Sequence, residues 1–397
     1  MAFSLLEDKG QCIGVFEGGL LSFGGSVPTE GLTWAYNRHL RGRPDVKYAK
    51  VVAPFSTIAL CLPKAMAAEL ENMTKRYKAH LRSLQIAQVD FAEQCTYDYI
   101  PEWFLLDYYR LRNEAIDYIW KEHGHRYDPD LHAHVARTWE VAADIADRTL
   151  KFDQIALQVA ASKNARFAKD VLAGRKMRIK YDPFRAITGR FATNEWSFPI
   201  HNLKEEYRKV ILPKNGQFLE LDYNAADARV LLSLSGQEQP MGDIHTWNIA
   251  NVFNEPNMAR KEAKARLFSW FFSNRLDKSL ELVYNREAAA KKYLKDGDVV
   301  NPYGRRIPLA DRKNALSYLL QSTVADLTHE KAYALSHLLR HKRSFVAFTM
   351  HDSVIIDIAE EDIGMMDELK EEFAKTRFGY YLANVSIGTN FGSMIKK

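Results

Sequence analysis

Hydrophobic and polar residues alternate differently in the two halves of this chain. Across residues 63–174 apolar positions recur at helical spacing, and two stretches, 64–88 and 133–160, are predicted to be long helices. Near the amino terminus, residues 12–16 and 20–23 are strand-like and flank a Glu-Gly-Gly turn, which predicts a small hairpin. The first half is therefore expected to be mainly helical, with a β-containing region before it.

After residue 174 strand-like and helical segments alternate. The predicted strands, each with a run of apolar or β-branched residues, are 177–181, 217–222, 345–350 and 354–358. A helix is predicted over 225–234. With no internal repeat and no long linker, this pattern favours an α+β fold in which the texture changes within one compact protein.

Two carboxylates stand at the ends of predicted strands. Asp222 ends the strand 217–222, where a carboxylate can face a cleft, although Asp222 or Asn224 could instead cap the following helix. Asp352 lies in the polar turn His351-Asp352-Ser353 between two apolar strands. This turn lacks the usual Asn-Gly or Asp-Gly pair, so a functional role and an ordinary polar loop are both open.

One predicted helix carries cations and aromatic residues at intervals of four. Arg260, Lys264, Phe268 and Phe272 share one broad face, because each step of four residues turns an α-helix by about 40°. Cations can bind phosphates and aromatic rings can pack on a sugar and base, so this face suits a nucleoside triphosphate. An ordinary amphipathic helix with a solvated basic start would show the same pattern.

Composition says more about the compartment in which the protein works than about the reaction it carries out. The 397 residues carry a net charge of +5, a mild basic bias that is compatible with a polyanionic partner. Three cysteines without CxxC spacing argue against a disulfide framework and a zinc site. The amino terminus lacks the apolar run of a signal peptide, and no stretch is long enough to span a bilayer. A soluble, cytoplasmic protein is expected, with no membrane partner.

The motifs taken together resemble the DNA polymerase I family, or family A DNA polymerases. Asp222 to Arg229 resembles motif A (DYSxxExR), Arg260 to Phe272 motif B, and Met350 to Ser353 motif C (VHDE). Four shorter segments resemble the family's TGR, DIH, GRR and QGTAAD in the family's order: Thr188-Gly189-Arg190, Asp243-Ile244-His245, Gly304-Arg305-Arg306 and Gln321 to Asp326. The resemblance covers about residues 177–397, and seven motifs in order are highly specific.

This resemblance implies a right-hand polymerase fold, with an antiparallel-sheet palm and helical fingers and thumb. The implied boundaries are an N-terminal region of unknown role (1–97), a thumb (98–175), a palm in two parts (176–246 and 308–397) and fingers (247–307). The implied enzyme is a compact bacteriophage-type DNA polymerase that extends a primer on a template with dNTPs. It is expected to act as a monomer, with any exonuclease or other replication proteins as separate partners.

The resemblance also implies roles for individual residues. Asp222 and Asp352 would bind two Mg²⁺ ions, for which Mn²⁺ could substitute, with the Tyr223 backbone as a further ligand. The incoming nucleotide would be bound by Arg260, Lys264, Phe268, Phe272, His245 and Asp227. Primer–template DNA would be contacted by Arg190, Gln321, His351 and Arg229.

Each of the three main motifs departs from the family pattern. Asp227 stands where Glu is usual, Phe272-Ser273 where Tyr-Gly is usual, and Ser353 where Glu is usual. Both catalytic aspartates are retained, so the departures bear on nucleotide selection rather than on the reaction. The short N-terminal region lacks a DxE motif, so no proofreading exonuclease is expected.

Two other functions remain open. A single-subunit RNA polymerase shares the palm, the lysine-bearing fingers helix and a His-Asp-Ser motif C, although motif A here is of the DNA polymerase type. A non-catalytic nucleic-acid-binding protein could keep the scaffold, but the intact Asp222, Asp352, Arg260 and Lys264 argue against it.

Overall fold

The computed structural model divides the chain into two compact units, Met1–Asp147 and Arg148–Lys397. It describes residues 3–6, 13–17, 20–23, 49–52, 58–89, 99–163, 177–193, 197–272, 276–309 and 314–397, without the side chains of residues 3–23, Tyr109, Asn113 and Phe272. The predicted thumb, 98–175, has helices in both units. The palm, fingers and thumb boundaries therefore stay predictions. Within these residues, no helix combines the length and apolar character needed to cross a membrane.

The first unit begins with a three-stranded antiparallel sheet in the order β1-β2-β3. The predicted hairpin is confirmed, because β2 and β3 pair with Glu17 opposite Leu20. The strand that pairs with the other edge of β2 was not predicted. The three strands are β1 (Phe3–Leu6), β2 (Ile13–Glu17) and β3 (Leu20–Phe23).

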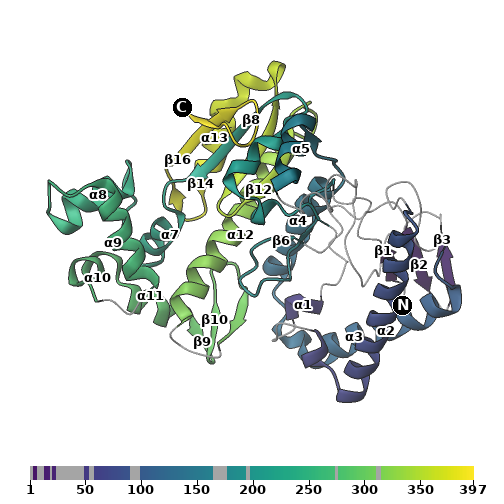
Figure 1. The fold of residues 1–397 in the computed structure, drawn as a ribbon. Helices are drawn as coiled ribbons and strands as arrows, with labels where there is room; N and C mark the ends of the chain where they lie inside the picture. Colours follow the sequence, from purple (N-terminus) through teal and green to yellow (C-terminus); the bar gives the residue numbers. More distant parts are fainter. Residues whose placement is uncertain are drawn as a thin grey trace. The chain divides into compact units, whose positions relative to one another are not determined.

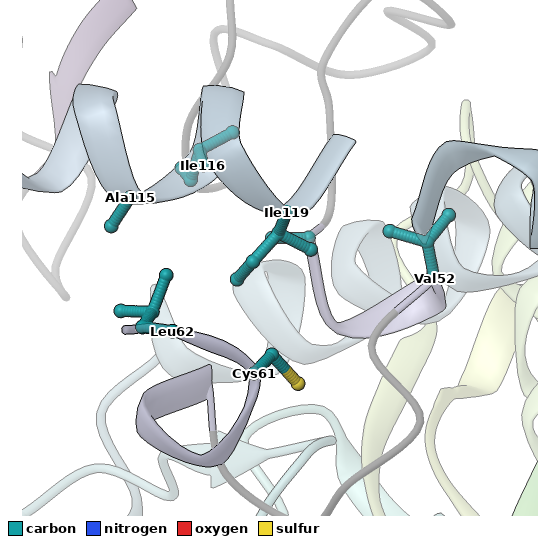
Figure 2. Close-up of a cluster of buried hydrophobic side chains, with 7 residues drawn as sticks. Val52, Cys61, Leu62, Ala115, Ile116 and Ile119 are labelled. Carbon is teal, nitrogen blue, oxygen red and sulfur yellow. The ribbon is translucent and has the colours of Figure 1, made fainter. Parts of the chain in front are cut away.

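Helices make up most of the first unit. The predicted helix 64–88 is confirmed as α2 (Lys64–Ile86), which packs on α3 (Glu102–His123) around Phe104, Leu105 and Tyr108. A second cluster joins α3 to the shorter segments α1 (Ala49–Val52) and η2 (Ile58–Cys61), with the Cys61 side chain buried in it (Figure 2). The unit ends with η4 (Gly124–Arg126) and α4 (Pro129–Ala146).

The prediction of one helix over 133–160 is wrong, because two helices occupy this stretch. The Asp128 carboxylate caps the first of them, α4, by accepting hydrogen bonds from the Asp130 and Leu131 amides. This helix starts earlier than predicted and ends at Ala146. The predicted helix therefore covers only part of α4 and runs past its end.

The second helix of this stretch has its own cap. After α4 the chain forms the short strand β4 (Lys151–Phe152). Asp153 then accepts hydrogen bonds from the Ile155 and Ala156 amides at the start of α5 (Gln154–Lys163). Two capping aspartates thus start two separate helices.

A five-stranded antiparallel sheet forms the centre of the second unit, in the order β12-β13-β8-β16-β17. The predictions for 217–222, 345–350 and 354–358 are confirmed, whereas 177–181 is not a strand except at its last residue. The sheet consists of β8 (Gly216–Tyr223), β12 (Phe345–Met350), β13 (Ser353–Ala359), β16 (Ala383–Gly388) and β17 (Ile395–Lys396).

Short pieces complete the sheet region. Strand β4 pairs with β7, and β5 pairs with β6, while β14 and β15 form a two-stranded hairpin. Their bounds are β5 (Tyr181–Asp182), β6 (Ala192–Thr193), η6 (Ile200–Asn202), η7 (Glu205–Val210), β7 (Ile211–Leu212), η10 (Glu360–Met365), β14 (Lys375–Thr376) and β15 (Gly379–Tyr380).

Long helices cover the sheet and connect it to a helical group. The buried helix α12 (Ala315–Leu338) packs on β12, on α13 (Met366–Ala374) and on α7 (Ala226–Leu234), which confirms the helix predicted over 225–234. Helix α7 also contacts α10 and α11. Because α7 follows β8 directly, the end of that strand lies where the sheet and the helical group meet (Figure 1).

The helical group is built from residues 244–292 and is followed by a small antiparallel sheet in the order β11-β10-β9. The described chain is thus α+β. The elements are α8 (Ile244–Asn248), η8 (Ile249–Phe253), α9 (Arg260–Phe272), α10 (Lys278–Tyr284), α11 (Arg286–Lys292), β9 (Leu294–Lys295), β10 (Asp298–Val300) and β11 (Arg306–Pro308).

Candidate functional site

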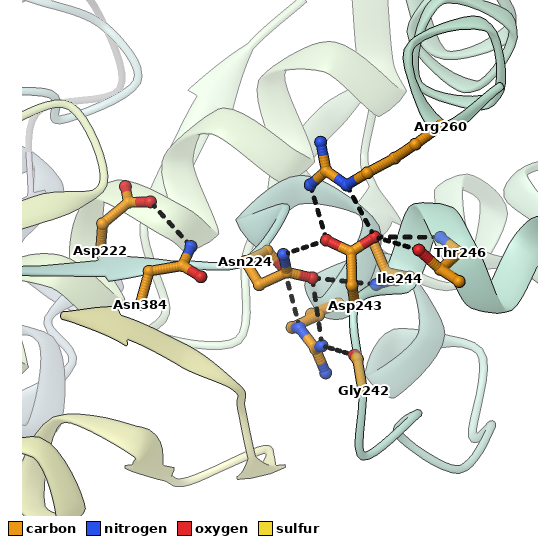
Figure 3. A network of polar contacts seen from close by, with 9 residues as sticks. Asp222, Asn224, Gly242, Asp243, Ile244, Thr246, Arg260 and Asn384 are labelled. Carbon is orange, nitrogen blue, oxygen red and sulfur yellow. Dashed lines mark hydrogen bonds and ion pairs between the residues drawn. The ribbon is translucent and has the colours of Figure 1, made fainter. Parts of the chain in front are cut away.

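The two aspartates predicted as metal ligands lie on neighbouring strands. Strand β8 pairs with β13 on one side and with β16 on the other, so Asp222 lies opposite Ser353 and Asn384. Asp352 immediately precedes Ser353, and its charge acts on the Asp222 carboxyl. Asn384 Nδ2 donates a hydrogen bond to Asp222 Oδ2 at 3.3 Å (Figure 3). The sheet register, rather than proximity in sequence, brings the carboxylates together.

Asp352 lies in a tight and strained turn. Met350 pairs with Ser353, which leaves only His351 and Asp352 between the strands. His351 has φ 55°, in the left-handed region that a residue with a Cβ adopts at a cost of about 1–2 kcal/mol. Such strain is concentrated at functional sites, and here it places Asp352 at the strand ends instead of in a longer loop.

The environment shifts both carboxyls at these strand ends toward their protonated, neutral forms. Burial and the neighbouring Asp352 raise the pKa of Asp222 to about 7, against a smaller lowering by Asn384. Burial also raises the pKa of Asp352, although His351, Arg190 and Lys264 oppose the shift. Buried carboxyls of this kind are suited to a cation, because a cation favours their ionised forms.

Sequence reasoning missed a third carboxylate, Glu220. It lies two residues before Asp222 on β8, so the two side chains share a face of the sheet. Burial raises the pKa of Glu220, the nearby Ser353 side chain and Arg208 lower it, and Asp352 raises it further. Ser353 stands where the resembled motif has Glu, so Glu220 brings a carboxylate close to that position from the adjacent strand. The period-two spacing from Asp222 was the available signal.

Helix α9 brings its predicted nucleotide-binding residues to one face beside α8. Lys264 Nζ lies 5.7 Å from the centroid of the Phe268 ring, and this ring lies 6.5 Å from that of His245. Phe268 is 36% exposed, so its ring can accept a ligand. Lys264 also acts electrostatically on Asp352, which links the helix face to the aspartates.

His245 and Arg260 differ in charge. Burial lowers the pKa of His245 to about 4, with Arg260 and Lys264 adding to the effect and Asp243 opposing it. The imidazole is therefore neutral at pH 7 and can donate one hydrogen bond. Arg260 remains charged, and it pairs with Asp243 through Nε–Oδ1 and Nη2–Oδ2 distances of 3.1 and 2.6 Å (Figure 3).

Asp227 occupies the first turn of α7 and is half-buried. Burial raises its pKa to about 6, while Arg190 lowers it and Asp352 raises it. Its Oδ1 atom has no hydrogen-bond partner among the described residues. Arg190 thus acts electrostatically on two of the carboxylates, since it also lowers the pKa of Asp352.

Three of the short sequence motifs meet beside Arg190, through contacts of Arg305 with Gly189 and with Asp326. Arg305 binds the buried Asp326 in a two-point ion pair, with Nε–Oδ2 and Nη2–Oδ1 distances of 2.9 and 2.7 Å. Gly189 packs on the Arg305 guanidinium so closely that a Cβ at this position would lie 2.4 Å from Arg305 Cζ. Gly189 also has φ 77°, so both its backbone and its surroundings require glycine.

A cavity of about 330 Å³ opens beside the turn that holds Asp352. His351 stacks on His201 at 5.6 Å between ring centroids, and His201 stacks on Tyr181 at 5.4 Å. The Tyr181 hydroxyl donates to the Thr349 carbonyl at 2.8 Å, which fixes the end of β12. The cavity is lined by polar and cationic residues that include Arg185, Arg190, Asn202, His201, Thr349 and His351.

Of three further predicted site residues, the structure describes the side chains of two. Tyr223 is buried on the opposite face of β8, where its hydroxyl donates to the Phe373 carbonyl, so only its backbone faces the aspartates' end of the strand. Gln321 donates to Ser317 Oγ one turn earlier on α12. The Phe272 side chain lies outside the described part of the structure.

Arg229 is enclosed within the protein. Its side chain is 0% exposed, and its guanidinium donates to the carbonyl oxygens of Asn224, Pro240 and Gly242. These carbonyls occupy the donors of the guanidinium, and the nucleic-acid contact expected for Arg229 stays a prediction. The buried arginine fixes the loop before α8, because backbone carbonyls need donors when buried.

Comparison with known proteins supports the fold. No protein-family model and no curated protein matches this sequence. Among solved structures, the POL domain of Pol1 from M. smegmatis, in complex with DNA primer-template and dNTP, is similar with a TM-score of 0.56 and 12% identity, over 73% of this chain and 76% of that chain. The bacteriophage type stays a prediction. Identity this low shows the fold alone: the chain has an α+β fold like that of a family A DNA polymerase domain.

Proposed function

We propose that this chain is a template-directed, primer-dependent DNA polymerase that transfers deoxynucleotides to a primer 3′-hydroxyl with two divalent metal ions. The observation that carries the proposal is the pairing of the Asp222 strand end with the Asp352 turn, within electrostatic reach of Lys264 on α9. A fold shared with a DNA polymerase domain supports it. In this assignment the sheet is the palm and the helices α9–α11 belong to the fingers.

The donor set fits magnesium. Carboxylate oxygens are the ligands that hard divalent cations prefer, and burial raises the pKa of both Asp222 and Asp352, so a bound cation would favour their ionised forms. Asp222 and Asp352 would hold the ions, with the Tyr223 carbonyl as a further ligand and Mn²⁺ as a substitute. When bound, two such ions activate a hydroxyl nucleophile and neutralise a leaving pyrophosphate.

The other residues of the site orient the substrates. Arg260 and Lys264 supply positive charge for the triphosphate, and the neutral His245 supplies one hydrogen bond without adding charge. Phe268 offers an exposed ring to the sugar of the incoming nucleotide. Arg190, Gln321 and His351 are assigned to the primer–template, for which the cavity beside His351 provides polar and cationic surface.

Primer extension with the purified chain tests the proposal. Wild-type protein is expected to extend a primed template with dNTPs and Mg²⁺, whereas Asp222→Asn and Asp352→Asn should each lower the rate at least about 100-fold, as loss of a preorganised charge-stabilising group does. DNA binding should be largely unchanged, because neither carboxylate attracts the phosphate backbone of DNA. A variant that keeps more than about a tenth of the wild-type rate would contradict the metal assignment.

Two other outcomes are informative. Unprimed synthesis from NTPs would identify the chain as an RNA polymerase. DNA binding without synthesis under any condition would identify a non-catalytic binding protein. We further propose that the enzyme acts as a monomer and that proofreading, where present, comes from a separate protein.

A further inference from the structure

Hydrogen-bond donors of neighbouring residues occupy both oxygens of the Asp243 carboxylate. Its Oδ1 accepts from the Thr246 amide at 3.0 Å, from Thr246 Oγ1 at 3.1 Å and from Arg260 Nε at 3.1 Å. Its Oδ2 accepts from Asn224 Nδ2 at 2.7 Å and from Arg260 Nη2 at 2.6 Å. Two carboxylate oxygens offer about four lone pairs, so this group is saturated and has none left for a metal or a substrate.

The position of Asp243 is itself fixed from several directions. As the N-cap of α8, it is held by the first turn of that helix. Asn224 Oδ1 accepts from the Ile244 amide at 2.9 Å, while the preceding Gly242 carbonyl accepts from the buried Arg229 at 2.8 Å (Figure 3). Asn224 lies only two residues after Asp222. The network therefore runs from the end of the metal-binding strand to the first residue of α9.

Arg260 is held at one edge and open at the other. Asp243 takes two of the five N–H donors of the guanidinium, from Nε and Nη2. The side chain is still 53% exposed, so the remaining donors reach solvent on the same helix face as Lys264. A two-point pair of this kind sets the plane of a guanidinium as well as its position.

We propose that Asp243 is a positioning residue, which orients Arg260 for the triphosphate of the incoming nucleotide and links that orientation through Asn224 to the strand that carries Asp222. This inference rests on the proposed function. Asp243 acts through Arg260 and does not touch the nucleotide. Its removal should therefore weaken nucleotide binding only as long as Arg260 is present.

The chain offers a matched control, an aspartate that pairs with another arginine of α9. Asp277 is the N-cap of α10, accepting from the Ser279 and Leu280 amides, and its Oδ2 pairs with Arg266 Nε of α9 at 2.7 Å. It thus combines a helix cap with an arginine pair, as Asp243 does. Arg266 turns toward Glu255 and the Phe253 ring instead of toward Lys264. Loss of Asp277 should affect stability without affecting nucleotide affinity.

Single-nucleotide incorporation on a primed template gives the test, with kcat and KM for dNTP measured separately from DNA affinity. Asp243→Asn, which retains a good capping side chain, should raise KM about tenfold, as loss of a group that orients a ligand-binding residue does. Asp243→Ser, a second capping variant, should behave alike. Asp277→Asn should leave KM within about twofold of wild type, since it retains the same kind of cap.

The double variant Asp243→Asn/Arg260→Ala decides between positioning and a general structural role. We expect its KM to equal that of Arg260→Ala, since Asp243 then has nothing to orient. Multiplying effects, or a lower KM in Asp243→Asn because the aspartate competes with phosphate, would overturn the inference. If Arg260→Ala raises KM and Asp243→Asn does not, only this inference fails. A wild-type chain that incorporates no nucleotide would overturn the proposed function itself.

Discussion

At the scale of single residues, Asp222 and Asp352 reach the same site through different local structures. Asp222 lies within a regular strand that is paired on both sides, whereas Asp352 lies in a two-residue turn after a left-handed His351. Asp222 is therefore placed by the sheet, and Asp352 by a strained backbone that the two flanking strands hold in position.

The raised pKa of Asp222 predicts a pH-dependent cost to the metal-free protein. Its pKa is about 7 in the folded state and near its ordinary value of about 4 when unfolded, so between these values only the folded state keeps the proton. Stability from this group is full below pH 4 and is lost as the pH rises through 7. In EDTA, Asp222→Asn should therefore melt at a higher temperature than wild type at pH 8, with a smaller difference at pH 5.

Added Mg²⁺ provides the control for that experiment. A cation bound by the folded state should raise the melting temperature of wild type at pH 8 and have less effect on Asp222→Asn. Equal melting temperatures of the two proteins at both pH values would show that burial does not destabilise the Asp222 carboxylate.

Sugar selection is also decided by single residues. In the resembled family the motif A Glu lies against the sugar and is held by a motif B Tyr, and this chain has Asp227 and Phe272 instead. Asp227 is one methylene shorter, its Oδ1 is buried without a described partner, and phenylalanine has no hydroxyl to donate. We expect weaker discrimination against ribonucleotides than in a Glu–Tyr enzyme, because one such contact is worth about 1–3 kcal/mol.

Three proteins test this expectation through kcat/KM for dNTP and rNTP. Relative to wild type, Asp227→Ala should relax selectivity further, and Asp227→Glu/Phe272→Tyr should restore it. A double variant with no more selectivity than wild type would contradict this view of the gate.

At the scale of elements, helix α9 brings positive charge to a site that is built on a sheet. Lys264 acts on Asp352 and lies over the Phe268 ring, so it is near both the proposed metal ligand and the ring proposed to contact the sugar. Lys264→Ala should raise KM for dNTP and lower kcat, each by about tenfold or more, because the lysine stabilises charge that grows in the transition state. Lys278→Ala, an exposed lysine of α10, is the control; equal effects of both changes would contradict a specific role.

The contact between Gly189 and Arg305 joins elements that are far apart in sequence. Gly189→Ala should destabilise the protein, because the new Cβ meets a guanidinium that Asp326 holds in place. Gly297→Ala is a matched control, since Gly297 has φ 86° and nothing within 4 Å of a Cβ. Urea unfolding should show Gly189→Ala less stable than Gly297→Ala by at least about 1 kcal/mol. Equal losses would mean that the backbone angle alone requires glycine.

At the scale of the whole molecule, the five-stranded sheet and its helices belong to the second unit. The first unit consists of a small sheet and the helices α1 to α4. We predict that these 397 residues have no 3′→5′ exonuclease activity, because the sequence lacks the acidic DxE motif near its start. A mismatched, end-labelled primer should stay intact. Degradation that persists in an Asp222→Asn/Asp352→Asn double variant would contradict this.

Sequence was sufficient where local patterns carry the information. Runs of apolar and β-branched residues predicted β8, β12 and β13, because such runs are typical of strands buried in a sheet. Intervals of four predicted the cationic face of α9, because residues four apart share one face of a helix. The division between α4 and α5 was missed because the capping Asp153 was overlooked within a run of helix-forming residues.

Only the tertiary structure decided which of these residues meet. The register that sets Asp222 opposite Ser353 joins segments that are distant in sequence, whereas the capture of Arg260 by Asp243 and the enclosure of Arg229 join elements that lie closer along the chain. The resemblance to motif A does not indicate that Arg229 is enclosed, yet its guanidinium donates to three backbone carbonyls. Such pairings depend on sheet register and on the burial of polar groups across the whole unit, which no local pattern of hydrophobic and polar residues contains.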